Sequence, residues 1–256
     1  MDGPLRIAAV QMGVHQASRE QGIKEAEALV REAARQGARL VCLPEHWLAS
    51  HVIEPSGELY KAFSELAAEL GLYINLGGLY EAGNPVRFVS PTLSPKGTLI
   101  GRQAKVHLYG RERELAAPGS GYELLEVDGI RAGVLVCHDV VFPESARALA
   151  LKGAELLLVP SLIVRRGTEP WHIYVMARAL ENRVPVVAPN AYAPPLFIGR
   201  SIIVDLYYDE QEGVMLLKKH VMPDGKGILL AEVNPAALRH LRQERLGERR
   251  PEAYDA

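Results

Sequence analysis

One cysteine in the middle of the chain has surroundings suited to chemistry. Cys137 ends a β-branched apolar run, Gly133 to Val136, and polar residues follow it at once. Sheets in α/β proteins present their reacting atoms at the carboxyl ends of strands, so a nucleophile fits this position. A buried structural cysteine fits it as well, because free cysteine is among the most buried residue types. This stretch by itself leaves both interpretations open.

Three charged residues also stand in notable contexts. Glu45 follows a short apolar strand and a proline, and burial there would raise its pKa and suit it to proton transfer. Lys105 ends a predicted strand, where an inward-pointing amine needs carboxylate partners. Glu112 follows in a turn rich in glycine and arginine that can fold back. Taken singly, each also fits a solvated surface charge.

Composition narrows the class of protein. The chain has 256 residues, 48% of them hydrophobic and 23% charged, with a net charge of −2. These values are ordinary for a globular protein with a sizeable core. The near-neutral charge, with no basic run interleaved with aromatics, predicts no binding to nucleic acid or to an anionic membrane.

The cysteine content and the lengths of the apolar runs predict the cellular compartment. Only two cysteines are present, so we expect a reducing compartment and no disulfide framework. The first residues lack the layout of a signal peptide, and no apolar stretch approaches the roughly 20 residues that span a bilayer. We therefore expect a soluble, cytoplasmic protein.

Hydrophobic periodicity predicts alternating helices and strands. A turn at Asp128-Gly129 is the strongest hairpin signal. The predicted helices cover 18–37, 59–70, a segment from about 145, 171–182 and 235–243. The predicted strands cover 6–12, 40–43, 73–79, 88–93, 98–105, 122–127, 130–137, 186–188, 201–206, 214–219 and 227–233.

The chain contains an internal repeat. Residues 31–45 can be laid over residues 147–161 without a gap, so that Arg, Gly-Ala, Leu and Pro coincide. Any two helix–strand units look somewhat alike, but this agreement favours two similar α–β layers packed sheet to sheet within one domain spanning 1–256. It places Glu45 and Ser161 at equivalent strand ends, and therefore directs Glu45 toward the cleft of Cys137.

Motifs in order along the chain resemble those of the nitrilase, or carbon–nitrogen hydrolase, superfamily. They are Leu43-Pro-Glu45, Lys105-Val-His-Leu-Tyr109 with Glu112, and Cys137-His-Asp-Val-Val-Phe-Pro-Glu144. The resemblance covers nearly the whole chain. It implies a four-layer α-β-β-α sandwich, which agrees with the internal repeat.

The resemblance also implies roles for these residues. Cys137 is the expected nucleophile and Glu45 the general base. Lys105 and the backbone N–H of His138 are the expected donors to the oxyanion. Glu112 is expected to hold Lys105 or to orient the substrate. Neither a metal nor an organic cofactor is implied.

Local departures bear on the substrate. Cys137-His-Asp is closer to the Cys-aromatic-Asp of amidases than to the Cys-Trp-Glu of true nitrilases, which favours hydrolysis of a small linear amide to acid and ammonia. Arg165 and Arg166 lie in the loop after Ser161, and the sequence favours a solvated loop there; the alternative is that they bind a substrate carboxylate in a bidentate fork, as in ω-amidases and N-carbamoyl amino acid hydrolases. Tyr109, Ser161 and Trp171 are further candidates for substrate contact.

Other functions share the same features. A nitrilase and an acyl transferase would use the same triad, and a catalytically silent binding protein would keep the fold. We expect a homodimer or larger homo-oligomer by resemblance. The polar tail, residues 244–256, has no core of its own and is expected on the surface or at a subunit interface.

Overall fold

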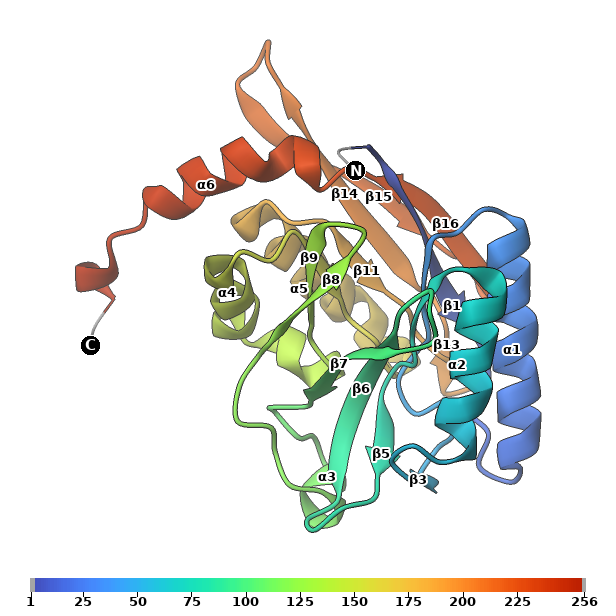
Figure 1. Cartoon of the computed structure of the whole chain (residues 1–256). Helices are drawn as coiled ribbons and strands as arrows, with labels where there is room; N and C mark the ends of the chain where they lie inside the picture. Colours follow the sequence, from blue (N-terminus) through green and yellow to red (C-terminus); the bar gives the residue numbers. More distant parts are fainter. Residues whose placement is uncertain (1–2, 255–256) are drawn as a thin grey trace.

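The fold has two β-sheets packed face to face, with helices on both outer sides (Figure 1). The computed structural model describes residues 3–254. The first sheet has eight strands. Across it lie β16 (Gly227–Val233), β1 (Leu5–Gln11), β2 (Leu40–Cys42), β4 (Tyr73–Asn75), β6 (Arg87–Leu93), β5 (Leu79–Glu81) and β3 (Val52–Ile53), with β7 (Leu99–Ala104) also paired to β6.

The second sheet has six strands. In order they are β15 (Val214–Val221), β14 (Ile202–Asp209), β11 (Val186–Ala188), β10 (Leu156–Leu158), β9 (Ile130–Val134) and β8 (Leu124–Val127). A separate two-stranded ribbon consists of β12 (Tyr192–Ala193) and β13 (Phe197–Ile198).

Three apolar layers hold the sandwich together. Along β1, Ala8 and Val10 pack with α1 (Arg19–Arg35) and α2 (Glu58–Leu70), while Ile7 and Ala9 face the other sheet. This alternation is the period of a strand with both faces covered. A third apolar layer joins the second sheet to α4 (Pro143–Lys152) and α5 (Thr168–Asn182). The predicted four-layer α-β-β-α sandwich is confirmed.

The internal repeat is present in the topology. Strands β1, β2 and β4 are parallel, with antiparallel β16 and β6 on either side. Strands β9, β10 and β11 are likewise parallel, with antiparallel β8 and β14 on either side. The helices α1 and α2 connect the first three strands, and α4 and α5 connect the second three. Each half is therefore the same α–β layer.

The hairpin at Asp128-Gly129 is confirmed. Val127 pairs with Ile130, and Asp128 and Gly129 have φ angles of 50° and 80°, as a two-residue type I′ turn requires. The turn also ties the two sheets together. Nη2 of Arg39, at the start of β2, donates to Asp128 Oδ1 at 2.9 Å.

The main differences between the structure and the predicted elements are at four places. The strand predicted over 73–79 is interrupted between β4 and β5, where Gly77 has a φ of 68°. The strand predicted to reach Cys137 ends at Val134, and a 3-10 segment, Cys137–Val141, follows. α5 begins at Thr168, and the last helix is a 3-10 turn followed by α6 (Arg239–Gly247). Each difference lies at an element end, where local turn geometry outweighs periodicity.

The C-terminal helix leaves the body of the molecule. α6 and the short 3-10 turn Pro251–Ala253 project away from the sheets (Figure 1). The tail predicted over 244–256 is described as far as Tyr254, and positions 255–256 lie outside the described residues. Within the described part of the chain, no helix combines the length and the apolar character that crossing a membrane demands.

Candidate active site

Lys105 lies between two buried carboxylates. Its Nζ donates to Glu45 Oε1 at 2.7 Å and to Glu112 Oε1 at 2.8 Å. Lys105 is 1% exposed, Glu45 2% and Glu112 6%, so the charges are shielded from water and depend on one another. The structure therefore brings together three of the residues that the sequence singles out.

Close backbone approach holds Glu45 in place. Glu45 follows β2, forms a bridge with Gly78 and donates its backbone N–H to the Ser161 carbonyl at 3.3 Å. A Cβ at Gly77 would lie 1.9 Å from the Pro44 carbonyl oxygen. Only glycine allows this approach with a positive φ, so the interruption after β4 is what lets Glu45 reach the site.

Backbone hydrogen bonds fix Lys105 in place, and neighbouring carboxylates balance the positive charge of its amine. Its N–H donates to the Phe88 carbonyl at 2.8 Å, and its carbonyl accepts from Gly119 at 2.7 Å. Burial by itself would lower the pKa of Lys105, but the Glu45 carboxylate, Cys137 and the Glu112 carboxylate outweigh it and raise that pKa. The amine is therefore a permanent cation.

Glu112 begins a short helix, α3 (Glu112–Leu115). Its Oε2 accepts from the Tyr109 backbone N–H at 2.8 Å. Burial would raise the pKa of Glu112, but hydrogen bonds from His46, Lys105 and the Tyr109 amide hold it below its ordinary value. Glu112 is thus an ionised carboxylate whose two oxygens are both engaged.

His46 is a member of this cluster that sequence reasoning missed. Its Nε2 lies 3.1 Å from Glu112 Oε1, and its Nδ1 lies 3.1 Å from the Ala49 carbonyl oxygen. Both partners are acceptors, so both ring nitrogens must carry protons, and the ring is an imidazolium. Burial would lower the pKa of His46, but Glu112 and Glu45 raise it above the ordinary histidine value. Its only sequence signal is that it directly follows Glu45.

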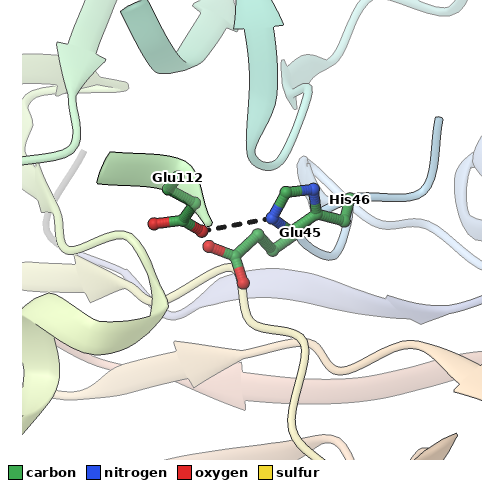
Figure 2. A group of neighbouring side chains, drawn as sticks. All are labelled: Glu45, His46 and Glu112. Atoms are coloured by element: carbon green, nitrogen blue, oxygen red, sulfur yellow. Dashed lines mark hydrogen bonds and ion pairs between the residues drawn. The ribbon is translucent and has the colours of Figure 1, made fainter. Parts of the chain in front are cut away.

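The cluster has the composition of a metal site but already holds a cation. Ligand atoms of Glu45, His46 and Glu112 lie within 4.8 Å of one another, and Figure 2 shows their side chains converging. The Lys105 amine, however, donates to both carboxylates, and an imidazolium has no lone pair to offer a metal. The Lys105 amine is therefore the cation that the two carboxylates bind.

Cys137 lies at a strained turn after β9. Its φ of 47° is unusual for a residue other than glycine, and its N–H donates to the Pro160 carbonyl at 2.9 Å. Burial and the neighbouring Glu45 carboxylate raise the pKa of Cys137 well above its ordinary value, against the opposing charge of Lys105. The resting group is a thiol with a carboxylate beside it.

Asp139 links the cysteine turn to the lysine segment. Its Oδ2 accepts from the Val136 N–H at 3.0 Å and its Oδ1 accepts from the His107 N–H at 2.8 Å. Asp139 is fully buried. The third residue of the Cys-His-Asp motif therefore positions Cys137 relative to Lys105, a role that the sequence pattern alone did not indicate.

Two cavities meet at Cys137. The first, of about 310 Å³, is lined by the charged cluster and also by Tyr80, Arg111 and Phe197. The second, of about 300 Å³, is lined by His138 and Trp171 among other residues. Cys137, Tyr109, Leu162 and Val164 line both cavities.

The other predicted contact residues divide into two groups. Tyr109 lines both cavities, and His138 and Trp171 line the second. Ser161 lines neither; it is buried, and its hydroxyl donates to the Val159 carbonyl at 3.0 Å.

Arg165 and Arg166 are exposed and also line neither cavity. The arginine that lines the first cavity is Arg111, which sequence reasoning passed over because it lies in a polar turn.

Comparison with known proteins gives the family. The carbon–nitrogen hydrolase family matches residues 6–243. A nitrilase from Pyrococcus abyssi is 33% identical over 78% of this chain and 80% of its own length. A deaminated glutathione amidase from Homo sapiens is 30% identical over 98% of this chain and 84% of its own length.

Solved structures share the fold. A carbon–nitrogen hydrolase from Helicobacter pylori G27 superposes with a TM-score of 0.83, covers 99% of this chain and 98% of its own, and is 24% identical. A mutant amidase from Nesterenkonia sp. AN1 in complex with butyramide has a TM-score of 0.78, covers 98% of this chain and 95% of its own, and is 25% identical. The resemblance seen in the sequence is confirmed, and the chain belongs to the carbon–nitrogen hydrolase family.

Proposed function

We propose that the chain hydrolyses a small linear amide to an acid and ammonia through a thioester on Cys137. The observation that carries the proposal is the position of Lys105 between Glu45 and Glu112, beside the thiol. A buried base, a fixed cation and a nucleophile in one cavity are the parts that acyl transfer requires. The relatives named as amidases support the same reaction.

The first half-reaction forms the thioester. The thiol is protonated at rest because its pKa is raised, so Glu45 takes the proton as Cys137 Sγ bonds to the amide carbon. The carbonyl oxygen becomes an oxyanion, which Lys105 and the His138 N–H stabilise by about 3–4 kcal/mol per donor. Glu45 then gives its proton to the nitrogen, the C–N bond breaks and ammonia leaves.

The second half-reaction returns the enzyme to its starting state. Glu45 takes a proton from water as the water oxygen bonds to the thioester carbon. The C–S bond breaks, the acid leaves and the proton passes from Glu45 to the Cys137 sulfur. Glu112 takes no proton in either half; it holds Lys105, and His46 holds Glu112.

Four alternatives differ in what supports them. A substrate carboxylate held by Arg165 and Arg166 is not supported, because neither arginine lines a cavity at Cys137. A silent binding protein is not supported by the assembled cluster. Nitrile hydrolysis and acyl transfer use the same three residues, and the choice of substrate and acceptor in the assay separates them from amide hydrolysis.

The test is ammonia release from short amides and matching nitriles, with intact-mass detection of an acyl adduct. We expect release from amides, little from nitriles, and a loss of at least about 10³-fold in kcat in Cys137→Ala and Glu45→Gln, since each variant removes a group needed in both half-reactions. Equal activity of the wild type and Cys137→Ala would refute the thioester route.

Assembly of like subunits is part of the proposal. Exposed apolar side chains on α4 and α5, Leu151 and Leu180, and the projecting C-terminal segment (Figure 1) support a homodimer or larger homo-oligomer. The molar mass of the full chain in solution measures it.

A further inference from the structure

The walls of the second cavity at Cys137 are predominantly apolar. Its lining includes Val140, Val141, Leu162, Ile163, Val164, Pro170, Trp171 and Tyr174. No aspartate, glutamate, lysine or arginine is among its lining residues. Its volume of about 300 Å³ is at the small end of the range for ligand sites. The cavity is therefore suited to a small apolar group.

The position of the charged cluster decides which part of a substrate enters this cavity. Glu45 and Lys105 line the first cavity only, so the breaking C–N bond and the attacking water belong there. When ammonia is the leaving group, everything else in the substrate is attached to the carbonyl carbon that bonds to Cys137. That acyl substituent must extend from Cys137, and the second cavity is the space at Cys137 that is free of the charged cluster.

We propose that the second cavity is the acyl subsite and that the substrates are primary amides with an uncharged, apolar acyl group. The proposal rests on the proposed function and narrows its substrate class. It excludes ω-amido acids as good substrates, although Arg165 and Arg166 left them open as an alternative in the sequence.

Desolvation is the physical reason for this preference. A carboxylate in the second cavity would lose water without gaining a cation, because the nearby arginines are exposed on the 3-10 turn Arg165–Gly167 and line neither cavity. His138 does not replace them. Burial, together with the charge of Lys105, lowers the pKa of His138 and so disfavours the cationic form of its ring. An unpaired buried carboxylate is strongly disfavoured.

Substrate pairs with the same carbon chain test the proposal. We expect kcat/KM to rise about fourfold per methylene from propionamide to valeramide, the gain from burying one CH₂. We expect valeramide to exceed glutaramate on the order of tenfold or more, the penalty of an unpaired carboxylate. Glutaramate matching or exceeding valeramide would overturn the proposal. Loss of that activity in Arg111→Ala would then assign the carboxylate to the first cavity.

Two neighbours on α5 give a matched pair of variants. Tyr174 lines the second cavity, whereas Ile173, which is 57% exposed, lines neither. We expect Tyr174→Ala to lower kcat/KM about tenfold for valeramide, the loss of roughly two buried methylenes' worth of contact, and much less for propionamide. Ile173→Ala should match the wild type with both. Equal effects of the two substitutions would count against the subsite.

A third variant reverses the selectivity. Val164 lines both cavities and is 42% exposed, so a lysine there can keep its amine solvated while its stem borders the cavity. We expect Val164→Lys to shift the valeramide to glutaramate ratio toward glutaramate by on the order of tenfold, and an unchanged ratio would contradict the assignment. An acyl adduct on Cys137 with any amide keeps the proposed function intact whichever substrate is preferred. If no amide gives an adduct, the proposed function fails, and the subsite fails with it.

Discussion

At the scale of single residues, the cluster around Lys105 is balanced in charge. Glu45 and Glu112 by themselves would leave one negative charge in excess around Lys105, and His46, protonated on both nitrogens, cancels it. The His46 ring also packs against Phe88 and Tyr80, with centroids 4.6 and 5.5 Å away, where aromatic faces favour a cation. Neutrality lets the site hold four charged groups out of water without a net field that would oppose loss of the thiol proton.

Substituting His46 tests this balance. In His46→Gln the amide keeps a donor for Glu112 but loses the charge. We expect a folded enzyme whose kcat falls about tenfold with little change in KM, since a positioning group commonly contributes on the order of 1–2 kcal/mol to the barrier. Nitrogen NMR of the wild type at pH 7.5, about one unit above the ordinary histidine pKa, should show a doubly protonated ring that disappears in the variant. His240→Gln, at a side chain that is 81% exposed, is the control. A neutral His46 ring at that pH would contradict the assignment.

Residue types and motif order were enough to predict the positions of Glu45, Lys105, Glu112 and Cys137. Each belongs to a motif beside a strand end or a tight turn, so its backbone position follows from the elements. The role of His46 was not predicted, because it depends on a contact with Glu112, a residue distant in the sequence. The contacts of Arg165 and Arg166 stayed open in the sequence, because a sequence does not show which way side chains point on a short 3-10 turn.

At the scale of elements, turns rather than strands aim the functional groups. The periodic segments were predicted nearly to their ends, because burial on both faces dictates their pattern. The break between β4 and β5 and the turn at Cys137 were not, because both depend on positive φ angles and close backbone approach. Glycine at 77 indicates such a turn but does not reveal that it makes room for Pro44.

Substitutions at two glycines with similar backbone conformations distinguish the cost of a left-handed backbone from the cost of steric overlap. Gly71 ends α2 with a φ of 65° and has open space where a Cβ would lie, whereas Gly77, with a φ of 68°, would place a Cβ 1.9 Å from the Pro44 carbonyl oxygen. We expect Gly71→Ala to cost about 1–2 kcal/mol from the left-handed conformation alone. We expect Gly77→Ala to cost at least about 1–3 kcal/mol more from overpacking.

Urea unfolding measures both substitutions. Activity at a temperature where both variants are folded supplies the second readout, since only Gly77→Ala should displace Glu45. Equal losses of stability in the two variants would show that the close approach to Pro44 carries no cost.

At the scale of the whole molecule, an ion pair fastens one sheet to the other. The Arg39 guanidinium, which also lies over the Tyr73 ring at 5.4 Å, holds the pKa of Asp128 below its ordinary value. A lowered folded pKa means that the pair stabilises the fold fully above the unfolded carboxyl pKa, near about 4. That contribution declines as the pH falls through the folded pKa.

Asp128→Asn isolates this charge, because asparagine is as well suited as aspartate to a type I′ turn. We expect the free energy of unfolding at pH 7 to fall by about 1 kcal/mol, a modest value because Arg39 is partly exposed. We also expect the difference from the wild type to shrink toward zero as the pH falls through the folded pKa of Asp128. Urea titrations from pH 7 down to that value check both points, and a difference independent of pH would mean that the pair is not its source.

The internal repeat bears on the number of active sites in one polypeptide. The equivalent strand ends of the two like halves meet where the Glu45 amide donates to the Ser161 carbonyl, so both halves converge on one candidate active site. One strand end supplies a carboxylate, and its counterpart supplies a serine turned toward its own backbone. A doubled scaffold thus yields a single centre. Titration with an acylating substrate should therefore saturate at one acyl group per polypeptide.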